Sequence, residues 1–243
     1  VAMFDDGTHD DGRAGDGLYG AQIPPYTDGA VVEFYVEAFD GDGRSRTWPA
    51  PSLMDGQWEQ VTNVLYRVDS ALDADSYWQI GGKPLYYVVM TEMERGRLAR
   101  IGSRSNGEED TNAAMNGTFI SIDGTGASLC YRAAVRNRGH GTRTGPPNNF
   151  HVAFPRDGLW KGRSAINFNC RYTHVQILGS AIFRMAGLAA ADAAAAELRI
   201  NGADLAQTGS SMYGVYVRLD AFDDDFAERH FRDDPNGNLY TCY

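Results

Sequence analysis

The feature that most constrains the fold is one well-marked helix in a chain whose other patterned segments are mostly predicted strands. Apolar residues recur at helical spacing between residues 175 and 185, which places them on one face of a helix. The stripe comprises Val175, Leu178, Ile182 and Met185. Thr173 and Gln176 have the spacing of a capping box, and Gly187 stands where a helix commonly ends. We therefore predict a helix over 174–187, packed by its apolar stripe on a neighbouring layer.

Short strand patterns separated by turn signals surround this helix. Strands are predicted over 85–90, 117–122, 128–135, 150–154, 164–169, 197–200 and 213–219. An Asp123-Gly124 turn joins two of them into a hairpin. Two shorter helices are predicted, one ending near residue 101 after a Thr91–Glu94 capping box and one over about 226–231.

The order of these elements from residue 117 predicts an α+β layer. Two strands, a basic glycine-rich loop, two strands, the long helix, two strands and a short helix follow one another. A protein-kinase N-lobe likewise has strands before and after one long helix, which there lies between the third and fourth strands. The predicted fold class is therefore α+β, a kinase-like N-lobe with an antiparallel sheet and one long helix.

The first 76 residues have a different character. Residues 30–39 alternate apolar and polar side chains, and Asp-Gly turn signals stand on both sides of them. We predict that residues 1–48 are the C-terminal part of a β-sandwich module whose earlier strands are missing. Residues 49–76, which begin with Pro-Ala-Pro-Ser, are predicted to be a linker with one short strand near 61–67, and residues 77–243 to be the main domain.

Charge and hydropathy exclude several classes of function. The formal net charge of −10 opposes non-specific contact with a nucleic-acid backbone, so no nucleic-acid partner is expected. No apolar run reaches the roughly 20 residues that a membrane helix needs, so no membrane span is expected. Three cysteines without a CxxC pair make a zinc site improbable.

The densest basic stretch runs from Arg136 to Gly145. Its arginines offer forked donors, and its glycines let backbone N–H groups approach an anion. Arg136, Arg138, Gly139 and Gly141 are the residues that we expect to contact phosphate. An ordinary polar hairpin loop, whose arginines pair with surface carboxylates, remains the equal alternative.

A lysine and a strand end complete the candidate site. Lys161 stands just before the strand 164–169 and could reach a nucleotide phosphate, with Arg163 and Arg171 as rivals for that role. A solvated lysine at a strand entrance is at least as plausible from spacing alone. In the kinase arrangement Leu219 and Asp220 lie where backbone groups would bind adenine.

Acidic residues do not suggest a metal site. Asp223, Asp224 and Asp225 read as helix capping, because three consecutive side chains diverge around a helix axis. The aspartates between residues 5 and 16 could form a calcium site, but they lack EF-hand spacing. No metal ligands are therefore assigned.

Several motifs together resemble the CotH-type spore-coat kinase domains over about residues 77–243. They are Arg136-Asn137-Arg138-Gly139, Asn167-Phe168-Asn169, Tyr172-Thr173-His174, the run from Leu178 to Leu188, Arg199-Ile200-Asn201-Gly202, Tyr213 to Val217, Asp223-Asp224-Asp225-Phe226 and Gly237-Asn238-Leu239-Tyr240. The first 20 residues resemble the Ig-like module that often precedes such domains. The resemblance implies a kinase-like fold, ATP with Mg²⁺, a serine-rich coat or surface protein as substrate, and a secreted or cell-surface location in a bacterium.

Two departures from the family pattern bear on activity. Asp220 stands where the family usually has Glu, and Thr241 where Lys is usual. The family's catalytic and metal-binding aspartates lie downstream of the Gly-Asn-Leu-Tyr segment, so we expect them beyond Tyr243. The chain is expected to be a fragment of an exported atypical kinase, without kinase activity of its own. The alternative is a non-catalytic cell-surface or spore-coat structural or binding module.

Overall fold

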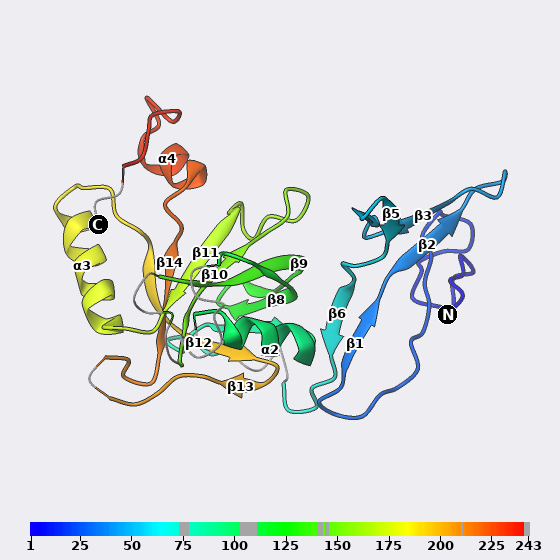
Figure 1. Cartoon of the computed structure of the whole chain (residues 1–243), viewed down its shortest axis with the longest axis horizontal. Coiled ribbons are helices and arrows are strands. Elements are labelled where there is room, and N and C mark those ends of the chain that lie inside the picture. Colours follow the sequence, from blue (N-terminus) through cyan, green and yellow to red (C-terminus); the bar gives the residue numbers. More distant parts are fainter. Residues whose placement is uncertain (73–77, 103–110, 140–142, 144–145, 210, 241–243) are drawn as a thin grey trace.

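A closed β-barrel dominates the computed structural model, which describes residues 1–72, 78–102, 111–139, 143, 146–209 and 211–240 (Figure 1). The barrel strands are β7 (Leu85–Val89), β8 (Met115–Asp123), β9 (Gly126–Arg138), β10 (Asn149–Ala153), β11 (Ala165–Asn169), β12 (Ala193–Ile200) and β14 (Tyr216–Asp220). Their order around the barrel is β7-β8-β9-β10-β11-β14-β12, and a short β13 (Ala203–Asp204) extends the edge of β12.

One parallel pairing closes the barrel. Residues 197–200 of β12 pair in parallel with residues 85–88 of β7, whereas the other pairings are antiparallel. The predicted kinase-like α+β N-lobe is therefore wrong, because the sheet returns on itself and the described helices are few and short. Closure satisfies the backbone groups that an open sheet leaves unpaired at its edges. Local patterns located most of these strands, but a contact between segments some 110 residues apart has no local signal.

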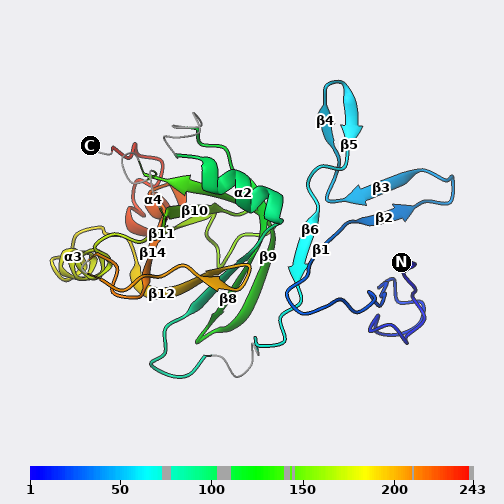
Figure 2. The ribbon, with the colours of Figure 1, turned by 60° about the horizontal axis from the view of Figure 1, so that its bottom comes forward.

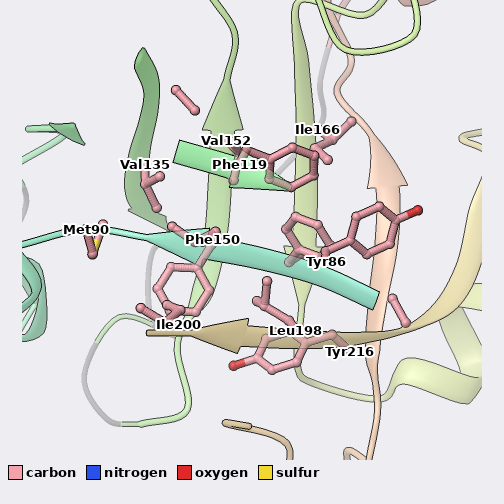
Figure 3. Packing of buried hydrophobic residues seen from close by; sticks show 14 of the residues in the cluster. Tyr86, Met90, Phe119, Val135, Phe150, Val152, Ile166, Leu198, Ile200 and Tyr216 are labelled. Atoms are coloured by element: carbon pink, nitrogen blue, oxygen red, sulfur yellow. The ribbon is translucent and has the colours of Figure 1, made fainter. Parts of the chain in front are cut away.

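The barrel interior is filled by aromatic and aliphatic side chains. The rings of Tyr86, Phe119 and Phe168 pack together with centroids 5.1 to 6.4 Å apart, and Leu198 and Tyr216 are almost fully buried. Figure 3 shows such side chains converging from strands on different sides of the interior. Alternation along each strand therefore sends one set of residues into the barrel and the other set outward.

Three helices are described: α2 (Glu92–Arg100), α3 (Thr173–Met185) and α4 (Asp224–His230). The predicted capping box of α2 is confirmed, since Thr91 accepts a hydrogen bond from the Glu94 N–H at 3.2 Å. Asp223 caps α4 in the same way by accepting from the Phe226 N–H. Within the described residues no helix is long and apolar enough to span a membrane.

The long helix α3 differs from prediction in two respects. Its N-cap is Tyr172, in a left-handed conformation without a side-chain cap, and Thr173 instead donates to the Met212 carbonyl at 2.8 Å. Its predicted apolar stripe faces outward, with Leu178 61% and Met185 87% exposed. The predicted C-terminal stop is confirmed, because the helix ends just before Gly187, which has φ +76°.

The N-terminal residues form two-stranded ribbons beside the barrel (Figure 2). Their strands are β1 (Val31–Phe34), β2 (Val36–Phe39), β3 (Ser45–Trp48), β4 (Ser52–Met54), β5 (Gln57–Glu59) and β6 (Val64–Arg67), paired as β1–β6, β2–β3 and β4–β5. Leu65 of β6 packs on the outer face of β7 and β8, and the Leu65 carbonyl accepts a hydrogen bond from Thr118 Oγ1 at 2.6 Å. Nothing in the described residues confirms an Ig-like module, and the domain boundaries at 48 and 76 stay predictions.

Candidate functional site

A cavity with polar and apolar walls lies between α3 and the outer face of the barrel. It has a volume of about 750 Å³. The lining residues come from β9, β11, β14, α3 and the segments that follow α3 and β14. They are Arg138, Asn167, Asn169, Gln176, Gly179, Ser180, Phe183, residues 188–191, Leu219, Asp220, Phe222 and Phe231.

Strand register brings the polar side chains of this site together. Arg136 of β9 pairs with His151 of β10, His151 with Asn167 of β11, and Asn167 with Leu219 of β14. Directly opposed residues in a sheet point to the same face, so these four side chains form one row on the outside of the barrel. Arg138 and Asn169, two residues further along β9 and β11, occupy the same face.

A chain of hydrogen bonds ties α3 to the barrel across the cavity. Arg138 Nη1 donates to Asn169 Oδ1, and Asn169 Nδ2 donates to Gln176 Oε1 at 2.8 Å. Gln176 Nε2 in turn donates to the Arg171 carbonyl. Both side-chain amides thus present fixed donors and acceptors at the cavity wall.

The carboxylate of Asp220 lies on the opposite face of β14 from Leu219. It is 2% exposed and accepts from Arg163 Nε at 2.9 Å and from the backbone N–H of Asp192 at 3.1 Å. Arg229 Nη2 lies 3.5 Å from Oδ2, the oxygen that also accepts from Asp192. The backbone carbonyl of Asp220 accepts from Asn167 Nδ2 at 3.3 Å. Asp220 therefore holds the end of β14 in place rather than offering a free carboxylate to the cavity.

Asp192 extends this charged network to the segment after α3. It accepts from Arg218 Nη2 at 2.8 Å and lies 3.3 Å from Arg184 Nη1. Burial by itself would raise the pKa of Asp192, but the hydrogen bond and charge of Arg218 outweigh it, so that pKa is lowered. The carboxylate is therefore charged at neutral pH and anchors residues 188–191 against the barrel.

The structure brings only part of the predicted site together. Arg138, Leu219 and Asp220 line the cavity, and Arg163 is bound to Asp220. Arg136 lies beside Arg138 in the row described above. Gly139 follows the end of β9 with φ +100°, while Gly141 lies outside the described residues.

Lys161 is placed elsewhere. Its Nζ contacts Asp123 Oδ2 at 2.5 Å and Thr125 Oγ1 at 2.7 Å, both in the turn between β8 and β9. It is not among the described residues that line the cavity.

Several residues that line the cavity were not predicted from the sequence. Asn167 and Asn169 alternate with buried Ile166 and Phe168 in β11. Polar residues at every second position of an otherwise apolar strand are the sequence signal that indicates such site residues. The aromatic residues Phe183, Phe222 and Phe231 have no such signal in the sequence, because their position at the cavity depends on how α3 and α4 pack.

The described residues contain no group of three or more His, Cys, Asp or Glu side chains that could hold a metal ion. Near the N-terminus, Asp11 accepts backbone hydrogen bonds from Gly7 and His9, and Asp5 accepts from Gly15 and Gly17. These carboxylates stabilise the loop, as short Asx turns do. The described residues therefore present no preassembled Mg²⁺ site, and no step is assigned to the metal.

The described fold and cavity define a β-barrel protein with a mixed polar and apolar cavity under one helix. Compared with known families, residues 135–243 match the model of the family described as CotH kinase protein. Residues 135–243 are thus similar to the CotH kinase family, which confirms the resemblance seen in the motifs of that segment. The matched segment contains every described residue that lines the cavity. No curated protein gives a significant match to the chain.

Proposed function

We propose that the cavity under α3 binds ATP and that the chain is the nucleotide-holding part of a CotH-like protein kinase. The observation that carries this proposal is the position of the cavity. It lies wholly within the segment that matches the kinase family. Its volume of about 750 Å³ falls in the range of small-molecule and cofactor sites.

The chemistry of the lining supports a nucleotide. Arg138 supplies a guanidinium, the side chain best suited to phosphate oxygens, and Asn169 and Gln176 supply amides beside it. On the other side Phe222 and Phe231 supply aromatic surface against which a base can stack. Charged phosphates and an apolar base therefore each have a matching wall.

The proposed substrate is the serine hydroxyl of a coat or surface protein, and the proposed location is secreted or at the bacterial cell surface. Both follow from the family. Bound Mg²⁺ would neutralise phosphate charge.

Phosphoryl transfer also needs a carboxylate that positions the attacking hydroxyl. Among the described lining residues the only acid is Asp220, and arginines bind its carboxylate. We therefore propose that the described residues bind nucleotide without catalysing transfer.

Two glycines allow a matched test. Gly179 in α3 lines the cavity, and Gly96 in α2 is exposed; both have open space where a Cβ would stand. We expect ATP to bind the wild-type chain and the Gly96→Trp variant, and Gly179→Trp to weaken binding at least about tenfold, or about 1.4 kcal/mol, because its ring enters the cavity. Isothermal titration calorimetry measures each affinity. Equal ATP affinity of Gly179→Trp and wild type would place the nucleotide elsewhere.

A second candidate function is a non-catalytic structural or binding module. The exposed stripe of α3, with Leu178 61% and Ile182 55% exposed, favours it because large exposed apolar surfaces commonly serve protein contacts. Absence of ATP binding by the wild-type chain would support this function over the first.

A further inference from the structure

One histidine of the outer-face row is positioned to respond to an anion. His151 lies between Arg136 and Asn167 in the register of β9, β10 and β11. Neither Arg136 nor His151 is fully buried, so a ligand can reach both. Asn167 also lines the cavity, and Arg138 stands two residues from Arg136 on the same face.

Hydrogen bonds fix which nitrogen of His151 titrates. Asn167 Nδ2 donates to the Asp220 carbonyl, which can only accept, and this sets the orientation of the amide. Asn167 Oδ1 therefore faces His151 Nδ1 at 2.9 Å, and Nδ1 carries the proton. The remaining nitrogen, Nε2, is the atom that gains a proton when the ring becomes charged.

Among the described residues, the charged groups that act on His151 are cations. Arg136 and Arg138 of β9 act on its ring, and Arg143 acts on Arg136. No ion pair of Arg136 is found in the part of the chain that the structure describes. Burial, together with these arginines, keeps the pKa of His151 below its ordinary value, although the hydrogen bond with Asn167 opposes this. The ring is therefore neutral at neutral pH.

We propose that a phosphate group of the nucleotide lies over Arg136 and His151 and that its binding transfers one proton from solvent to His151 Nε2. This inference rests on the proposed function. A dianion beside the ring cancels the repulsion from the arginines and stabilises the imidazolium. The pKa of His151 is then higher in the complex than in the free chain, so binding tightens as the pH falls through the higher value. A rise of one unit in the pKa of His151 on binding corresponds to about a tenfold gain in affinity at pH below both pKa values.

The test separates the proton on the protein from the proton on the ligand. A phosphate also titrates near pH 6, so ATP affinity depends on pH even without His151. The control is His151→Gln, whose amide can still donate to Asn167 but does not titrate. ATP binding is measured calorimetrically at pH 6.0 to 7.5 in two buffers of different ionisation enthalpy, which yields the number of protons taken up.

We expect the wild-type chain to take up more protons than His151→Gln, by up to about one at the most favourable pH. Proton NMR of the wild-type ring, identified by its absence from the variant spectrum, should show a higher pKa with ATP than without. Equal proton uptake and an unmoved ring pKa, with ATP still bound, would overturn this inference and leave the proposed function standing. Absence of ATP binding at every pH would overturn both.

Discussion

At the scale of single residues, Lys161 and Asp123 form an ion pair on the turn between β8 and β9. Burial by itself would raise the pKa of Asp123, but the hydrogen bonds from Lys161 and Thr125, with the charge of Lys161, together outweigh it, so that pKa is lowered. A carboxylate whose pKa is lower in the folded than in the unfolded chain stabilises the fold at pH values above its pKa in the unfolded chain. This stabilisation is lost as the pH falls through the pKa that the carboxylate has in the folded chain. The pair is thus structural, and its contribution depends on pH.

Replacing this lysine separates the structural role from the nucleotide role predicted for it. We expect Lys161→Met to lower the free energy of unfolding by about 1 kcal/mol at pH 7, because the pair is partly exposed. The difference should shrink below the ordinary carboxyl value of 3.8. ATP affinity should be unchanged. Urea unfolding at pH 7 and at a pH below 3.8 measures the change in stability, and titration with ATP measures the affinity. A large loss of ATP affinity would show that Lys161 belongs to the nucleotide site.

At the scale of elements, α3 shows what periodicity can and cannot predict. The helical spacing from Val175 to Met185 located the helix, since backbone periodicity is a local property. It did not tell which face packs on the barrel. The capping box predicted for α3 did not form, because Thr173 donates its hydrogen bond to the Met212 carbonyl instead. Local signals therefore located α3, and tertiary contacts decided its orientation.

A buried leucine and an exposed leucine provide the prediction about how α3 packs. Leu198 of β12 is 1% exposed inside the barrel, and Leu178 of α3 is 61% exposed. We expect Leu198→Ala to reduce the free energy of unfolding by about 2–5 kcal/mol, because it leaves a cavity in the core. Leu178→Ala should change it by less than about 0.5 kcal/mol. Denaturant unfolding measures both, and equal losses would show that the α3 stripe is buried in solution.

At the scale of the whole molecule, barrel closure determines where the site lies. β12 and β14 are held beside β11 on one side and β7 on the other, and α3 covers the outer face of β12 and β14. Arg138 and Leu219 could be predicted as site residues because they stand at strand ends near motifs of the family. Phe222 and Phe231 could not, since only the path of the chain after β14 brings them to the cavity.

The central claim is that ATP occupies the cavity under α3, and hydrogen exchange with and without ATP tests it most directly. We predict that ATP slows exchange in peptides covering residues 165–191 and 216–231, which contain most of the cavity lining. Exchange in the turn at residues 123–126, beside Lys161, should not change. Protection confined to that turn, or no protection in the cavity segments at saturating ATP, would contradict the account.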